Sequence, residues 1–441
     1  MALPSEAQAR RLVDRVLVLS RAAGSEAIVR LTAGRGGNTR FAVSEITSSS
    51  ETEELRVAVT IAFGKRSATA VTNQLDDRSI DSVVGRAKQM ARLAPENPEQ
   101  MPPLGRQTFK PVPRASDGPT ASLAPAARAK ATGAALANAT STVALAGFYE
   151  HAAHMRAIGT SAGAWGYHTW TEANFSCTAR TADGTGSGWA AAAGNRVADL
   201  DAGAVAKLAV TKATTSAKPT KLDPGRYTVI LEPAAVADLL GELTGAFDAR
   251  AADEGRSFFA KAGGTKVGEK LFPDFITLRS DPTDAALAAQ PFDGEGLALV
   301  PRKWIDKGVV QGLTYGRFWA KKQGKQPTGR QTGWILDGGK ASRTELIKGV
   351  KRGVLITRFW YIRELDPQTL LQTGLTRDGT FLIENGAITR PVTNFRFNES
   401  PVQMLARCDG MTASAVSPMG GMRVPLLRTN EFNLASISDA V

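Results

Sequence analysis

Residues Arg226 to Asp248 read R-Y-T-V-I-L-E-P-A-A-V-A-D-L-L-G-E-L-T-G-A-F-D, and the second half of the chain is organised around them. Tyr227 to Leu231 is rich in β-branched and aromatic residues, which predicts a buried strand. Pro233 then stands where the first turn of a helix accepts proline. Apolar residues follow at helical spacing, namely Val236, Leu239, Leu240, Leu243 and Phe247. We therefore expect a strand that leads into a helix from Pro233 to Asp248, with one face packed into a core.

This predicted helix contains Gly241-Glu242-Leu243-Thr244-Gly245-Ala246 and no histidine. Glu242 thus stands alone where a hydrolytic metal site on a helix would also need imidazole ligands. Gly241 and Gly245 each cost roughly 1 kcal/mol relative to alanine inside a helix. We expect close packing of another backbone against the helix to account for both glycines.

Length and composition indicate a multidomain globular protein. The chain has 441 residues, 43% of them hydrophobic, so two or three domains are expected. No window approaches the roughly 18 apolar residues of a membrane-spanning helix, and no signal-peptide core precedes Leu19, so a cytoplasmic location is expected. Cys177 and Cys408 could form one bridge, but so few thiols predict a fold that does not depend on disulfides.

Most of the net charge of +12 comes from one region. Residues 300–380 carry 16 Lys or Arg against 6 Asp or Glu. Such a region could attract nucleic acid, an acidic peptide or an acidic partner subunit, or it could be a solvated basic face. The basic loop Lys321-Lys322-Gln323-Gly324-Lys325 is the candidate contact for a partner or substrate.

The order of predicted elements indicates an α+β protein in three parts. We expect an N-terminal α+β domain over 1–95, a middle domain over 114–218 and a β-rich C-terminal domain over 222–441, with a proline-rich linker over 95–113. The predicted N-terminal helix covers 6–23, and Asp77 or Ser79 could cap a second helix over 80–93. Strands are predicted over 27–31, 39–43, 54–63, 142–149, 151–159, 168–180 and 188–193. Sequence alone leaves open whether the C-terminal sheet is barrel-like or layered.

Several short motifs in the second half occur in a definite order. They are Lys270-Leu271-Phe272-Pro273-Asp274, Asp281-Pro282, Pro291-Phe292-Asp293-Gly294-Glu295-Gly296, Ile305-Asp306-Lys307-Gly308-Val309, Pro327-Thr328-Gly329, Leu382-Ile383-Glu384-Asn385-Gly386-Ala387-Ile388-Thr389-Arg390-Pro391-Val392 and Asn430-Glu431-Phe432-Asn433-Leu434. In this order and spacing they resemble the TldD/PmbA family, and within it the PmbA (TldE) branch.

The resemblance implies an N-terminal α+β region, a middle region and a β-rich C-terminal domain, in two-subunit assemblies that enclose a cavity. The TldD-type subunit is a zinc peptidase with HExxxH on a helix and a later cysteine ligand, whereas its PmbA-type partner lacks the motif. On this chain the HExxxH positions fall on Gly241, Glu242 and Ala246, and Ser417 to Gly421 offers no cysteine. We therefore expect no metal or cofactor here, with zinc only in a TldD-like partner that acts on peptides or unstructured proteins. Glu242 without a metal-activated water supplies at most a general base.

Other residues admit a functional and a structural interpretation. His151, His154 and Cys177 could form a metal site, but residues three apart on a strand point to opposite faces. Gly159-Thr160-Ser161-Ala162-Gly163 matches a nucleophile elbow but lacks the helix that should follow Ser161. Gly184 to Gly188 favours a hairpin over a phosphate loop. The run Arg358 to Arg363 could hold a peptide or nucleic acid, although a buried strand is preferred.

These observations leave three functional hypotheses. The first is a metal-free, PmbA/TldE-like subunit of a metalloprotease, inactive alone. The second is a nucleic-acid-associated protein that uses residues 300–380. The third is an independent peptidase with a ligand set that its motifs do not reveal.

Overall fold

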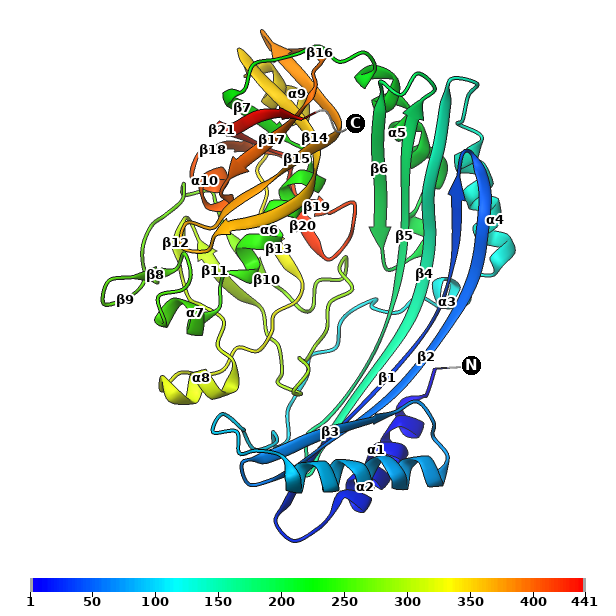
Figure 1. Cartoon of the computed structure of the whole chain (residues 1–441), viewed down its shortest axis with the longest axis vertical. Helices are drawn as coiled ribbons and strands as arrows, with labels where there is room; N and C mark the ends of the chain where they lie inside the picture. The colour runs from blue at the N-terminus through cyan, green and yellow to red at the C-terminus, as the bar shows by residue number, and fades with distance from the viewer. Residues whose placement is uncertain (1–2, 439–441) are drawn as a thin grey trace.

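The computed structural model describes residues 3–438 and contains a long six-stranded sheet beside a β-rich C-terminal domain (Figure 1). The long sheet is antiparallel with strand order β3-β2-β1-β4-β5-β6. Its strands are β1 Ser25–Ala42, β2 Glu45–Phe63, β3 Arg66–Thr72, β4 Val143–Thr160, β5 Trp165–Thr181 and β6 Ser187–Gly194. One face of this sheet lies toward the C-terminal domain (Figure 1).

Strands β1 and β4 are longer than the sequence predicted. Residues 27–31 and 39–43 were expected as two strands, but apart from Val43 they belong to one strand of 18 residues. The same holds in β4 for 142–149 and 151–159, apart from Thr142. The glycine-rich segment between them stays extended because β1 is paired on both sides. A Cβ on Gly36 would collide with the His151 carbonyl, and one on Gly37 would collide with the Arg128 side chain. These glycines therefore permit close approach rather than a turn.

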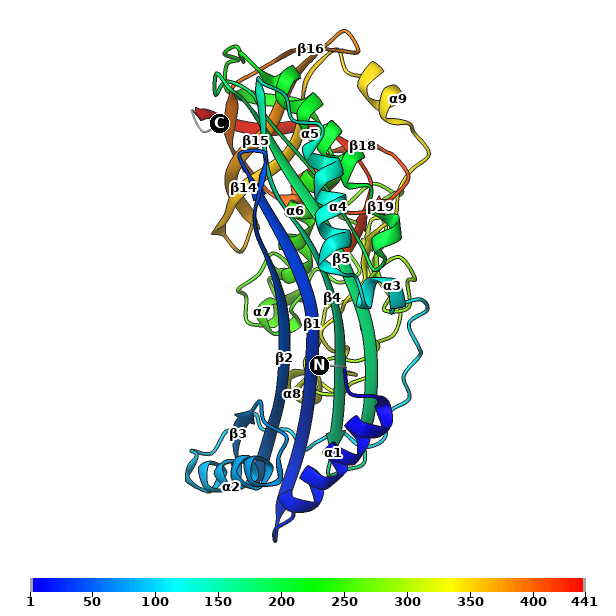
Figure 2. The same ribbon diagram turned by 90° about the vertical axis from the view of Figure 1, so that its right-hand side faces the viewer.

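The helices of the first half cover the face of the long sheet that points away from the C-terminal domain (Figure 2). They are α1 Glu6–Ser20, α2 Asp77–Leu93, α3 Gly118–Ala121, α4 Pro125–Leu136 and α5 Ala202–Ser216, with the short 3-10 helix η1 Val197–Asp199. Helix α1 ends at Ser20 rather than Ala23, and Ser5 and Gln8 form a capping box at its start. The cap of α2 is Asp76, not Asp77 or Ser79.

The segment 95–113 contains no helix or strand apart from the isolated bridge of Gly105 to Gly163. The strands on its two sides nevertheless pair directly, since β1 lies next to β4. The N-terminal and middle parts of the chain therefore share one sheet, and the helices of each part bury their apolar faces on it.

The C-terminal region contains two larger sheets, which confirms its β-rich character. Strands β14, β7, β21, β17 and β15 follow one another, and β15 also pairs with β14, so these five strands close into a ring. The strands of this sheet are β7 Gly225–Leu231, β14 Arg352–Asp366, β15 Leu371–Glu384, β16 Ala387–Pro391, β17 Asn394–Glu399, β18 Cys408–Met411 and β21 Leu427–Ser438. The C-terminal sheet is therefore barrel-like rather than layered. The sequence left this open because the ring includes the pairing of β7 with β21, whose paired residues lie up to more than 200 positions apart.

A second sheet has the order β12-β11-β10-β13-β20-β19. Its strands are β10 Leu278–Ser280, β11 Arg302–Asp306, β12 Val309–Val310, β13 Trp334–Leu336, β19 Ala415–Val416 and β20 Met422–Val424, and a small hairpin pairs β8 Ala260–Lys261 with β9 Gly264–Thr265. The helices of this region are α6 Pro233–Gly245, α7 Ala249–Asp253, α8 Arg317–Lys322, α9 Arg343–Lys348 and α10 Pro401–Ala406. None of the described helices is long and apolar enough to span a bilayer.

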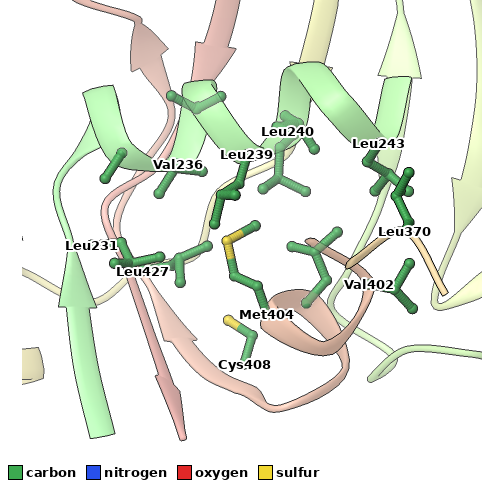
Figure 3. Close-up of a cluster of buried hydrophobic side chains, with 14 of the residues drawn as sticks. Leu231, Val236, Leu239, Leu240, Leu243, Leu370, Val402, Met404, Cys408 and Leu427 are labelled. Carbon is green, nitrogen blue, oxygen red and sulfur yellow. The ribbon is translucent and has the colours of Figure 1, made fainter. Parts of the chain in front are cut away.

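Strand β7 and helix α6 are the strand and the helix that the sequence predicts over residues 226–248. The helix begins at Pro233 as expected but ends at Gly245, and Asp248 caps α7 instead. All five predicted core residues, Val236, Leu239, Leu240, Leu243 and Phe247, are fully buried. Figure 3 shows the leucines of α6 above Met404, Val402 and Cys408. Burial of each such side chain contributes roughly 1.5–3 kcal/mol, so this face anchors the helix.

Candidate functional site

The candidate site lies on the side of α6 that does not carry its buried leucines. Asp238 and Glu242 stand one turn apart there, with Gly241 between them. An added Cβ on Gly241 or Gly245 would have nothing within 4 Å of it. The expectation that close backbone packing explains these glycines is therefore wrong. Because no other atom fills the place of the missing side chains, Gly241 and Gly245 leave open space next to the two carboxylates.

Asp238 is the most perturbed carboxylate on this helix. Burial raises its pKa to about 6, against a partial lowering by the Phe359 N–H and by the charge of Arg358. The backbone N–H of Phe359 in β14 donates to Asp238 Oδ2 at 3.2 Å. This contact ties the polar side of α6 to β14, and the pKa near 6 makes Asp238 able to exchange a proton close to neutral pH.

Glu242 lies in a second perturbed environment. Its pKa is raised, first by burial and then by the negative charge of Glu364 on β14. Two carboxylates one helical turn apart thus both favour their protonated forms more than in water. The positive charge near this face comes from Arg358, which influences Asp238.

Arg358 connects α6 to the long sheet. Its Nε lies 3.0 Å from Asp378 Oδ2, and burial lowers the pKa of its guanidinium. The same guanidinium stacks over Trp189 of β6 at 4.6 Å and over Trp360 of β14 at 5.2 Å. Ser187 of β6 donates to Asp378 as well. Residues from three separate strands, β6, β14 and β15, therefore meet beside α6.

The run Arg358 to Arg363 is a strand as preferred, yet it is not buried throughout. Phe359 points into the core at 3% exposure, whereas Trp360 and Tyr361 are 47% and 61% exposed. Tyr361 has a φ of 57° where the pairing of β14 with β15 is irregular, so a bulge turns these two rings outward. Arg377 and Arg363 stack on Trp360 and Tyr361, respectively.

The motif positions on α6 do not fit zinc. Gly241 carries no donor, and Ala246 packs partly buried against the core, which leaves Glu242 as the single ligating side chain of the three. Catalytic zinc needs three protein ligands of the imidazole, thiolate or carboxylate type. Within residues 3–438 no three His, Cys, Asp or Glu side chains are gathered so that they could hold a metal ion.

The two cysteines lie in apolar surroundings, separate from each other. Cys408 is buried on the leucine side of α6 (Figure 3), opposite to Glu242. Cys177 is buried in a different cluster, under α5. Burial raises the pKa of each thiol to about 12, so neither is a thiolate at neutral pH. Both are free.

The three histidines are held by structural contacts away from α6. His151 accepts from Arg128 at 2.9 Å on Nε2 and donates from Nδ1 to the Thr120 carbonyl at 2.8 Å, and burial lowers its pKa. His154 and His168 both stack with Trp170, with ring centroids 4.9 and 5.5 Å from it. His151 is buried and His154 is half-buried on the opposite face, as the spacing predicted.

Arg128 is a residue that the sequence did not single out. It is fully buried, pairs with Glu51 of β2 and contacts His151 of β4. A buried arginine needs such partners, and the glycines of β1 make room for it. This cluster joins α4 to the middle of the long sheet.

The nucleophile-elbow match is a turn. The Ala27 N–H donates to Ser161 Oγ at 2.9 Å, and Trp165 begins β5 rather than a helix. Gly184 and its neighbours form the β5–β6 hairpin, as preferred. Ser161 therefore has a structural partner and lacks the geometry of an activated serine.

Lys321, Lys322 and Lys325 lie on or just after α8 and are exposed. Lys322 stacks on Trp319 at 4.6 Å. Figure 1 shows α8 at the lower end of the C-terminal domain, apart from α6. The structure thus places these lysines outside the α6 site, where they remain candidate partner contacts.

Sequence reasoning overlooked Asp238, Trp189 and Asp378. A signal for Asp238 was present, because a lone aspartate one turn before Glu242 in an otherwise apolar helix marks a shared polar side. No comparable pattern links Trp189 or Asp378 to α6, since they are about 50 and 140 residues away along the chain.

Three family models match consecutive parts of the chain. The PmbA/TldA metallopeptidase domain 1 matches residues 27–91, the central domain matches 118–217 and the C-terminal domain matches 224–436.

Solved structures share the fold across nearly the whole chain. TldE from Thermococcus kodakarensis superimposes with a TM-score of 0.87 at 18% identity, covering 96% of this chain and 99% of that one. A proposed modulator of DNA gyrase from Bacteroides thetaiotaomicron gives 0.86 at 20% identity, covering 98% and 99%. The uncharacterized protein MJ0231 of Methanocaldococcus jannaschii is 35% identical over 103 residues, which is 23% of this chain and 24% of that protein.

Proposed function

Because the chain belongs to the PmbA/TldD metallopeptidase family, whose domain models match it in order from residue 27 to 436, we propose that it is the metal-free subunit of a TldD/TldE-type metalloprotease complex. In this proposal it does not hydrolyse peptides alone, and a TldD-like subunit supplies the zinc. The complex acts on peptides or unstructured proteins in the cytoplasm.

The observation that carries the proposal is the composition of α6 at the motif positions. Gly241 and Ala246 have no ligating atoms, and the one nearby cysteine lies on the opposite, leucine-packed side of the helix. Burial raises the pKa of Asp238 to about 6 and also raises that of Glu242, so either carboxylate could act as a general base. Without a metal ion, however, this helix offers no activated water to attack a peptide bond. The helix is thus equipped to position a substrate rather than to cleave it.

The exposed rings on β14 support a role in holding that substrate. Trp360 and Tyr361 stand out from the strand beside Arg358, which itself lies close to Asp238. Aromatic rings with flanking arginines offer apolar contact and cationic groups to an extended peptide. In the proposal this surface faces the substrate that the partner cleaves.

The basic region supports this proposal more than nucleic-acid binding. At least five of its basic residues are in ion pairs within the chain, namely Lys303, Arg317, Arg343, Arg358 and Arg377. Their charge is therefore partly neutralised before any partner arrives.

Reconstitution tests the proposal. The tagged chain is purified from its native host, its partner is identified by mass spectrometry, and peptidase activity and zinc are measured for each subunit and for the mixture. We expect activity in the mixture, loss of activity with a chelator, and less than about a tenth of an equivalent of zinc in this chain alone. Recovery of no TldD-like partner, together with chelator-sensitive hydrolysis by the isolated chain, contradicts the proposal.

A matched pair of variants tests the substrate surface in the same assay. Trp360→Ala is expected to raise KM of the complex several-fold at unchanged kcat, since it removes a contact made equally in ground and transition states. Leu93→Ala removes an even more exposed side chain, 85% exposed on α2, and serves as the control. Equal KM for both variants argues against substrate contact at Trp360.

A further inference from the structure

A groove of about 690 Å³ lies between α5 and the C-terminal sheet, away from the polar side of α6. Leu355, Phe381 and Pro391 are cross-strand neighbours on β14, β15 and β16, and together they form its apolar floor. Leu208 of α5 forms part of the opposite wall. The volume lies within the range of roughly 300–1,000 Å³ that is usual for sites of small ligands.

Two large apolar side chains of this groove are left in contact with solvent. Leu208 is 49% exposed and Ile388 is 41% exposed, although they come from separate parts of the chain. Their position on one groove makes them available to cover an apolar group of a ligand.

The charged residues of the groove have an unbalanced arrangement. Glu232 is occupied on both oxygens, by Lys212 Nζ at 2.6 Å and by Arg343 at 3.4 Å. Lys212 and Glu232 are both largely buried, at 13% and 16% side-chain exposure. Arg390 lines the same groove and donates to the neutral hydroxyl of Thr220. Three cations against one carboxylate leave an excess of two positive charges among the lining residues, which favours an anionic group.

Polar groups also line the groove along one side. Thr211 and Thr215 belong to α5, and Thr389 belongs to β16. The consecutive residues 388–391 of β16 place backbone at the wall, and β16 is the edge strand of its sheet. An alkyl chain would desolvate these groups without bonding them, whereas the amides of a peptide can hydrogen-bond to them.

We propose that this groove binds the C-terminal residue of a peptide, with the carboxylate on the Lys212, Arg343 and Arg390 cations and an apolar side chain over Leu355 and Phe381. The site would serve the proposed function by holding the end of a substrate or product. Binding is measured on the isolated chain, so its failure is distinct from a failure of the complex to form or to hydrolyse.

Calorimetric titration of the full chain with acetyl-Ala-Ala-Phe as the free acid tests the proposal. The same peptide as its C-terminal amide is expected to bind about tenfold more weakly, because it loses a charge-assisted hydrogen bond. Arg390→Ala should weaken binding of the free acid by a similar factor and leave the affinity for the amide unchanged. Arg11→Ala is the matched control, because Arg11 is an exposed residue of α1, which lies at the opposite end of the molecule (Figure 1).

Leu208→Asp is a second variant. It changes an exposed residue, so the protein should still fold, and it places a negative charge in the groove. It should abolish binding of the free acid while its melting temperature stays near that of the wild type. Equal affinity for acid and amide, or no binding of either, overturns the proposal. Tighter binding of decanoate than of the peptide acid overturns the peptide as occupant and assigns the groove to a fatty acid.

Discussion

Replacement of Asp238 by asparagine tests the electrostatics of the α6 site. Burial raises the pKa of Asp238 from 3.8 to about 6, so the folded protein holds this proton more tightly than the unfolded chain. The contribution of Asp238 to the free energy of unfolding is therefore highest below about pH 4, falls as the pH rises to about 6, and then levels off. At about 1.4 kcal/mol per pH unit the loss amounts to roughly 3 kcal/mol at most. The asparagine side chain keeps an acceptor for the Phe359 N–H but carries no charge to bury.

The assay is the melting temperature of wild type and Asp238→Asn, compared at pH 4 and pH 7.5. We expect similar melting temperatures at pH 4 and a gain for the variant at pH 7.5 of up to about 6–12 °C, from roughly 2–4 °C per kcal/mol for a domain of about 200 residues. Asp274→Asn is the control, and its melting temperature at pH 7.5 should fall rather than rise. Lys270 lowers the pKa of that exposed carboxyl, so the folded protein favours its charged form. The same difference in melting temperature between variant and wild type at both pH values would show that Asp238 does not carry a raised pKa in the folded protein.

Three further predictions concern the helix and the thiols. Leu240→Ala, at a fully buried position, should lower the free energy of unfolding by about 2–5 kcal/mol in urea titrations, and a loss below about 1 kcal/mol contradicts the packing. Gly241→Ala, one residue further, should instead raise it by up to about 1 kcal/mol in the same titration, since its Cβ meets open space; destabilisation would mean that a neighbour needs the glycine. Cys177 and Cys408 should be inert to Ellman's reagent at pH 8 in the native protein and titrate as two thiols after denaturation, whereas rapid native reaction argues against their burial.

The local elements around α6 could be predicted because short-range patterns define them. Tyr227 to Leu231 and the apolar spacing from Val236 to Phe247 each describe one element and the face it buries, and the structure confirms both. The boundaries were less certain: the helix ends at Gly245, and the long strands β1 and β4 were divided in two. The glycines within β1 are typical of a turn in the sequence. They lie in a continuous strand because β1 is paired with β2 on one side and with β4 on the other.

The α+β class, the strand-to-helix unit of β7 and α6 and the absence of imidazole at its motif positions could all be read from the amino-acid sequence. It also supported the family resemblance that the domain models bear out. The closure of five strands into a ring, and the meeting of Trp189, Asp238, Arg358 and Asp378 at one place, became visible in the three-dimensional fold. The physical reason is that periodicity reports which side of an element is apolar, whereas the partner of a polar side chain depends on pairings between distant segments.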